Sequence, residues 1–301
     1  MADPTDPLAT AASDLATDPH GVDEVVGHFA TDGANGSDLW TRSLPFASTT
    51  ESVHTRPDWV YEGPGQDEAI SRLLYVAQQR RPAAVIDGPG GTGKTTLLAT
   101  AAAELRRLGH PVLTLDLTAA TADDVIDQAA RQAGLAARDA DPTLVRLRAV
   151  RRWVDGQLAA DRLVIVADHL ADAQPCGVMV LDRLLAGCDS DRSTVTLLTT
   201  ASDSSGLRWL DRHAGLRVST GPLTEEQTVD FLAEGIAAAV PSAFTPRFTA
   251  EATACLHGQT GGVPRLLARM AGPIFLAGAS ERMTELTAEL VRAMQPELAA
   301  A

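Results

Sequence analysis

Residues 88–95 restrict the folds open to this chain, because glycine occupies four of the eight positions and a lysine and a threonine close the segment. A short apolar run at 83–87 precedes it, and a helical pattern at 94–108 follows. Glycines at such a turn let successive N–H groups point inward, and the N-terminus of the following helix adds a partial positive charge. The sequence therefore predicts a loop that cradles phosphate groups, which is the P-loop pattern. Its residues are Gly88, Pro89, Gly90, Gly91, Thr92, Gly93, Lys94 and Thr95.

The last two residues of this loop have separate expected roles. Lys94 is the single lysine among 25 basic residues, and all the others are arginine. A lysine that persists in such a composition is expected where a compact ammonium group is needed, here at the β- and γ-phosphates of a nucleotide. The Thr95 hydroxyl is placed to bind Mg²⁺, and Thr96 completes the expected nucleotide contacts. The predicted ligands are thus ATP and Mg²⁺.

A P-loop also needs a carboxylate that directs the metal ion from the end of a neighbouring strand. The apolar run at 163–167 ends in Asp168, and the run at 112–115 ends in Asp116. Both carboxylates are therefore expected at the carboxyl edge of a parallel sheet, beside the phosphates. We favour Asp168, because its apolar run is longer and unbroken.

The alternation of apolar runs and helical patterns predicts an α/β fold with a parallel sheet covered by helices on both faces. We expect a disordered acidic leader at 1–40, a P-loop domain at 41–221 and a small all-helical lid at 222–301. Strands are predicted at 83–87, 112–117, 163–167, 194–200 and 216–220. Helices are predicted at 69–79, 94–108, 122–133, 142–159, 178–186, 206–212, 224–240, 249–256, 264–276 and 284–294.

Composition excludes several other classes of protein. The formal net charge of -14 disfavours general coating of nucleic acids and binding to anionic membranes. No run approaches the roughly 18 to 20 apolar residues of a membrane helix, so we expect a cytoplasmic protein. Cys176, Cys188 and Cys255 are odd in number and lack histidines at ligand spacing, so we interpret them as buried thiols.

One helical segment combines cationic residues with an apolar face. The cations are Arg146, Arg148, Arg151 and Arg152, and the apolar face comprises Leu144, Leu147, Val150 and Val154. DNA contact is one interpretation. A solvated face over a core-facing stripe is the one we favour.

With these residues placed, the chain resembles AAA+ ATPases, and within them the GspA/ExeA-type group, over about residues 44–298. Besides the P-loop, the resemblance rests on segments upstream of it, at the junction of sheet and lid, and in the lid. These are Pro45-Phe46, Trp59-Val60-Tyr61, Leu73-Leu74-Tyr75, Gly221-Pro222-Leu223-Thr224-Glu225-Glu226, Phe231-Leu232 and Gly261-Gly262-Val263-Pro264-Arg265-Leu266-Leu267.

The resemblance implies roles that spacing alone does not assign. Arg265 would be the sensor-2 arginine, which reaches from the lid toward the γ-phosphate. Thr199 or Thr200 would lie in the sensor-1 region and orient the attacking water. Arg212 or Arg208 would be an arginine finger that acts on nucleotide bound by a neighbouring subunit, which implies a homo-oligomer.

The chain departs from the family pattern directly after Asp168, where members commonly carry glutamate and this chain has His169. A neutral histidine is able to act as a base near pH 7, so we expect slow ATP turnover. The expected function is a nucleotide-driven conformational or oligomeric switch that acts on a protein partner. The alternatives are an ATP-gated adaptor without appreciable hydrolysis and an ATP-dependent regulator that engages DNA.

Overall fold

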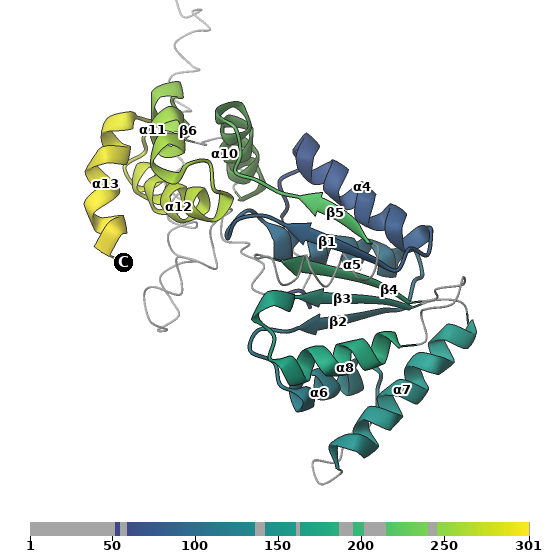
Figure 1. Cartoon of the computed structure of the whole chain (residues 1–301). Helices are drawn as coiled ribbons and strands as arrows, with labels where there is room; N and C mark the ends of the chain where they lie inside the picture. Colours follow the sequence, from purple (N-terminus) through teal and green to yellow (C-terminus); the bar gives the residue numbers. More distant parts are fainter. Residues whose placement is uncertain are drawn as a thin grey trace, which may run out of the picture.

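The structure is a computed structural model, and it describes residues 52–54, 59–135, 142–160, 163–186, 195–201, 215–239 and 246–300 (Figure 1). Several predictions therefore lie outside the described residues. They are the leader at 1–40, the segment Pro45-Phe46, Cys188, the helix at 206–212 and both candidates for the arginine finger, Arg208 and Arg212.

A five-stranded parallel sheet with the order β2-β3-β4-β1-β5 forms the larger part of the molecule. Strand β4 therefore lies between β1, which leads into the P-loop, and β3, which ends in Asp168. The predicted parallel sheet is confirmed, and each strand lies within one residue of its predicted bounds at either end. The strands are β1 Ala83–Asp87, β2 Val112–Asp116, β3 Leu163–Asp168, β4 Val195–Ala201 and β5 Leu216–Ser219.

Helices cover both faces of this sheet, because its central strands are apolar on both sides. Along β1, Ala83 and Val85 pack into one core cluster, and Ala84 and Ile86 pack into the other. The first cluster is closed by α6 Ala122–Gln132, α7 Thr143–Ala160 and α8 Pro175–Leu185. The second is closed by α4 Pro64–Gln78 and α5 Lys94–Arg107. A short 3₁₀ turn, η2 Leu170–Asp172, follows β3.

The lid stands at one end of the sheet and has its own apolar core (Figure 1). Its helices are α10 Glu225–Ala239, α11 Ala250–Thr260, α12 Pro264–Ser280 and α13 Ala288–Ala300. The start of α10 is capped as expected, because Thr224 N donates to Gln227 Oε1 (2.9 Å) and Gln227 N donates to Thr224 Oγ1 (3.2 Å).

The lid is not purely helical, which corrects the prediction that strands end at residue 221. Two short strands, β6 Arg247–Phe248 and β7 Glu285–Leu286, pair in parallel. Sequence periodicity misses them because two residues are too few to display an alternating pattern.

The segment before α4 packs against the lid. The Trp59 and Tyr61 rings lie 5.4 and 5.8 Å from the Phe231 ring, between centroids, and Tyr61 belongs to the lid core. The lid therefore follows the sheet along the chain and also contacts the segment that precedes the P-loop.

Two of the four arginines in the cationic segment of α7 pair with carboxylates of the same chain. Arg146 pairs with Asp123 and Asp127, and Arg151 pairs with Asp155 at 2.9 Å. Val150 and Val154 are buried as predicted, but Leu144 is 60% exposed, so the predicted apolar face is wrong at that position. Leu144 lies in the first turn of α7, before Val150 and Val154, which pack into the first core cluster.

The prediction of buried thiols is also wrong at Cys176, which is exposed, while Cys255 is half-buried. Cys176 lies in the first turn of α8, whose packed residues begin at Gly177. In the part of the chain that the structure describes, no helix has the length and apolar character needed to span a membrane.

Two glutamine side chains of α6 pair with the open edge of β2. Gln128 accepts a hydrogen bond from Asp116 N and donates one to Asp116 O, both at 2.8 Å. Gln132 makes the same pair of bonds with the backbone of Thr114. These amides replace a neighbouring strand and fix the backbone of Asp116, at the end of β2.

Candidate nucleotide-binding site

The P-loop is held against both the sheet and the lid. At its centre, Thr92 Oγ1 donates to Pro89 O (2.9 Å) and shares a hydrogen bond with Thr220 Oγ1 (2.9 Å). Thr220 N in turn donates to Asp87 O at 2.8 Å, immediately before the loop. Because Thr92 is buried and Thr220 follows β5, the end of the sheet fixes the path of the loop.

Glycine is required at position 91, where the loop meets the lid. Gly91 has a φ of 81°, and a Cβ there would lie 2.9 Å from Val263 Cγ1 and 3.1 Å from Arg265 Cβ. The amide of Arg265 donates to Gly91 O at 3.2 Å. The start of α12 thus rests directly on the phosphate-binding loop.

Lys94 is the first residue of α5, and its ammonium group folds back over the loop. Lys94 Nζ donates to Gly88 O and Pro89 O, both at 2.8 Å. Burial lowers the pKa of Lys94; the carboxylate of Asp168 opposes this shift, and the positive charge of Arg265 adds to it. An ammonium group whose charge is poorly solvated is well suited to pair with a phosphate.

Asp168 lies at the end of β3 and is 1% exposed. Its Oδ1 accepts hydrogen bonds from the Thr200 hydroxyl and from His169 N (2.9 Å). Its Oδ2 is buried and accepts no hydrogen bond from any residue that the structure describes. A buried carboxylate oxygen without a hydrogen-bond donor is unfavourable, and a bound divalent cation would offset that cost. Because Mg²⁺ prefers oxygen ligands, the residues beside the P-loop fit this ion.

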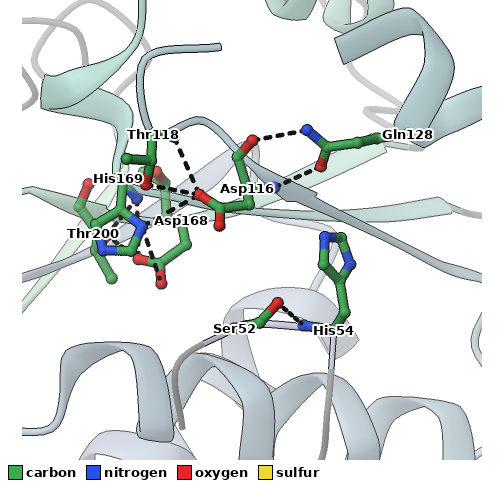
Figure 2. A network of polar contacts seen from close by, with 9 residues as sticks. Ser52, His54, Asp116, Thr118, Gln128, Asp168, His169 and Thr200 are labelled. Carbon is green, nitrogen blue, oxygen red and sulfur yellow. Dashed lines mark hydrogen bonds and ion pairs between the residues drawn. The ribbon is translucent and has the colours of Figure 1, made fainter. Parts of the chain in front are cut away.

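His169 follows with a left-handed backbone (φ 57°), which turns its side chain between two carboxylates. Its Nδ1 lies 3.4 Å from Asp116 Oδ1 and 3.5 Å from Asp168 Oδ2 (Figure 2). Asp116 is itself held by Thr118, whose backbone N–H and hydroxyl donate to Asp116 Oδ1 at 3.0 and 2.8 Å (Figure 2). Burial alone would raise the pKa of Asp116, but the two bonds from Thr118 and the charge of His169 lower it overall.

Most of the predicted residues line one cavity of about 300 Å³. Asp168 lines it and Asp116 does not. Of the two sensor-1 candidates, Thr200 lines it, whereas Thr199 is fully buried elsewhere. Gly88 and Pro89 lie beside the cavity and accept the hydrogen bonds of Lys94. The predicted residues in the lining are Gly90, Gly91, Thr92, Gly93, Lys94, Thr95, Thr96, Asp168, His169 and Arg265.

The cavity lining also contains residues without an assigned role in the sequence prediction. They are the neighbouring rings of Trp59, Tyr61 and Phe231, together with Val60 and the polar residue Gln66. They come from the segment before α4, from α4 itself and from α10. The first two are adjacent along the chain, and Phe231 of α10 follows them by about 170 positions. The sequence of the segment before α4 shows that it is apolar and aromatic. No local pattern predicts that Gln66 lines the same cavity as these aromatic residues.

The lid is connected to this site through the backbone. Leu223 N, in the segment between sheet and lid, donates to Gly262 O at 2.8 Å. Gly262 has a φ of 72°, and a Cβ there would clash with Leu223 O. Residue 262 lies three positions before Arg265, so the same short segment contacts both the P-loop and the segment between sheet and lid, which is called the hinge below.

Comparison with known proteins identifies the class of this fold. The family model described as "AAA domain" matches residues 63–198. Cdc6p from Pyrobaculum aerophilum has a TM-score of 0.64 and 16% identity, covering 82% of this chain and 70% of that one. ORC1 from Aeropyrum pernix, in complex with DNA, has a TM-score of 0.61 and 18% identity, with coverages of 85% and 69%. The RuvB Holliday junction branch migration motor of Thermotoga maritima has a TM-score of 0.52 and 17% identity, with coverages of 80% and 72%.

Together with the sheet order and the lid, these findings show that the chain has the AAA+ type of P-loop fold. Identities of 16–18% establish a likeness of fold alone, so function has to be argued from the site. No curated protein sequence matches the chain.

Proposed function

We propose that this protein binds Mg-ATP, hydrolyses it slowly and uses the bound nucleotide to set the position of its lid. One observation carries the proposal. Lys94, Asp168 and Arg265, from three separate parts of the chain, line the same cavity over the P-loop. A cation from the loop, a buried carboxylate from the sheet and a cation from the lid are the groups that a metal-bound triphosphate requires.

Each residue would have a distinct task in this reaction. The loop amides and Lys94 bind the phosphates, and Thr95 and Asp168 would hold Mg²⁺. The magnesium ion, when bound, offsets the charge that develops on the phosphate oxygens. Thr200, bonded to Asp168 and to His169 N, orients the polar groups at the end of β3 and β4. The imidazole of His169 lines the cavity and is the group that would accept a proton from the attacking water.

Arg265 would couple the nucleotide to the lid. Its backbone bonds to the P-loop, and its segment bonds to the hinge through Gly262. A γ-phosphate that attracts its guanidinium group would therefore act on a segment connected to both parts of the molecule.

The proposal predicts that Asp168→Asn lowers steady-state phosphate release at least tenfold while the protein remains folded. Asparagine keeps the shape and the acceptor oxygen at this buried position but removes the charge that would attract the cation. Asp155→Asn is the matched control, because Asp155 is exposed, lies on α7 and does not line the cavity. The measurement is phosphate release with magnesium and ATP, and equal rates for both variants and the unmodified protein would refute the role of Asp168.

An ATP-gated adaptor is the second candidate function, and the setting of His169 favours it. The Nδ1 atom of His169 lies within 3.5 Å of the carboxylates of Asp116 and Asp168, so this ring nitrogen faces acidic groups of the same chain. If His169 is for this reason unable to accept a proton from water, turnover would be negligible while nucleotide binding persisted.

The finer parts of the proposal rest on the resemblance to GspA/ExeA-type AAA+ ATPases. We propose a cytoplasmic homo-oligomer with Arg212 or Arg208 as its arginine finger and a protein as its partner, built as a P-loop domain at 41–221 and a lid at 222–301. Binding to DNA, as in the Aeropyrum pernix complex, is less favoured here. The net charge is -14, and Arg146 and Arg151 are engaged by carboxylates of the same chain.

A further inference from the structure

The lining of the cavity contains two chemically different groups of residues. The P-loop offers a cation and backbone amides, and the other group offers the rings of Trp59, Tyr61 and Phe231 and one polar side chain, Gln66. A nucleotide has the same two-part character, with charged phosphates at one end and a flat heterocycle at the other. The aromatic part of the lining is therefore the part that suits a base.

The side-chain amide of Gln66 lies beside Gly63 and the Tyr61 ring. Gln66 lies in the first turn of α4, and its backbone N–H donates to Gly63 O at 3.0 Å. A Cβ at Gly63 would lie 2.7 Å from Gln66 Oε1 and 2.5 Å from the nearest atom of the Tyr61 ring. The absence of a side chain at Gly63 therefore lets the amide and the Tyr61 ring share one small space.

The amide oxygen is the atom that points to a ligand. Gln66 is one of the residues that line the cavity, and its Oε1 is buried and accepts no hydrogen bond from any of the residues described in this structure. A buried acceptor without a donor is unfavourable, because it has lost water and gained nothing in exchange. A ligand that donates a hydrogen bond at this point would remove that penalty.

The purine bases differ in what they offer to such an amide. Adenine carries an amino donor beside the N7 acceptor, whereas guanine carries two acceptors, O6 and N7, on the same edge. A glutamine amide has one acceptor and one donor side by side, so it pairs with the adenine edge, while either orientation of the amide meets a repulsive atom on the guanine edge.

We propose that Gln66 selects adenine nucleotides, with its side-chain oxygen accepting a hydrogen bond from the exocyclic amino group of the base. This inference rests on the proposed nucleotide-binding function and adds to it the residue that chooses the base. The residue is proposed to act on binding alone, because the base takes no part in the transfer of the γ-phosphate.

The test is an equilibrium competition among three magnesium-bound nucleotides on the full chain. These are ATP, GTP and purine riboside triphosphate, which is ATP without the exocyclic amino group. The unmodified protein is expected to bind ATP about tenfold more tightly than either competitor. Gln66→Leu is expected to reduce both preferences to about twofold or less. Gln78→Leu, the same change at an exposed position at the end of the same helix, is expected to keep them.

The outcomes separate this inference from the proposed function. If the unmodified protein binds all three nucleotides with similar affinity, or if Gln66→Leu keeps the original preferences, the role of Gln66 is wrong while nucleotide binding stands. If the unmodified protein binds none of the three, the proposed function itself fails. The comparison on the unmodified protein decides the matter even if Gln66→Leu does not fold.

Discussion

Replacing Lys94 by alanine is expected to weaken the binding of Mg-ATP at least a hundredfold. The ammonium group lies over the P-loop, within reach of two loop carbonyls at 2.8 Å, where the β- and γ-phosphates would be bound. A factor of one hundred corresponds to about 2.7 kcal/mol, which is the usual size of a charge-assisted hydrogen bond to a poorly solvated group. The measurement is an equilibrium titration with ATP and magnesium.

Two further variants make this prediction specific. Arg107→Ala removes a cation from the last turn of the same helix, where Arg107 is exposed and paired with Glu104, so it has the same effect on net charge. It is expected to leave the affinity unchanged. Lys94→Arg keeps the charge but presents a planar group, and it is expected to bind more weakly than the unmodified protein. Equal affinities for Lys94→Ala and Arg107→Ala would contradict the assignment of Lys94.

Replacing His169 by glutamate is expected to raise the rate of phosphate release at least tenfold, about 1.4 kcal/mol in the barrier. A carboxylate stays unprotonated at neutral pH and is a dependable acceptor of the water's proton, whereas the Nδ1 atom of the present histidine faces the carboxylates of Asp116 and Asp168. The measurement is steady-state phosphate release at saturating ATP.

The surroundings of His169 require a second variant in this experiment. A glutamate at 169 would face the carboxylate of Asp116, which now lies 3.4 Å from His169 Nδ1. The double change Asp116→Asn with His169→Glu removes that repulsion, and it is expected to be at least as fast as His169→Glu alone. If neither variant releases phosphate faster than the unmodified protein, slow turnover is not caused by the absence of a glutamate at position 169. The adaptor function, in which hydrolysis has no part, would then be favoured.

The local features of the fold were predictable from the sequence because they depend on residues close together along the chain. The strand before Gly88, the helix after Lys94 and the apolar strand before Asp168 all show a clear period, and the structure has them at nearly the predicted bounds. The lid helices were likewise found, with the cap at Thr224.

The arrangement of these elements was not predictable, because strand order is decided by packing between distant segments. Asp116 and Asp168 end neighbouring strands, and only their pairing shows that both carboxylates flank His169. The sequence offered Asp116 as a competitor for the metal-directing role, and the structure places it beside the histidine and outside the cavity lining.

Gln66 illustrates the same limit most clearly. In the sequence it is one polar residue at the start of a helix, without a distinguishing pattern. Its significance appears only when Trp59, Tyr61 and Phe231 are brought around it and its amide oxygen is buried without a donor among the described residues. The exposed positions Leu144 and Cys176 were wrongly predicted for a related reason, since the first turn of a helix often extends beyond the surface that buries its later turns.

Isothermal titration calorimetry of the full chain with ATP and magnesium tests the central claim most directly. We expect one binding event per chain, with a similar event for ADP and none for Lys94→Ala at the same concentrations. If the folded, unmodified protein releases or absorbs no heat of binding with ATP, ADP or GTP, the cavity over the P-loop is not a nucleotide site and the account given for Lys94, Asp168 and Arg265 is wrong.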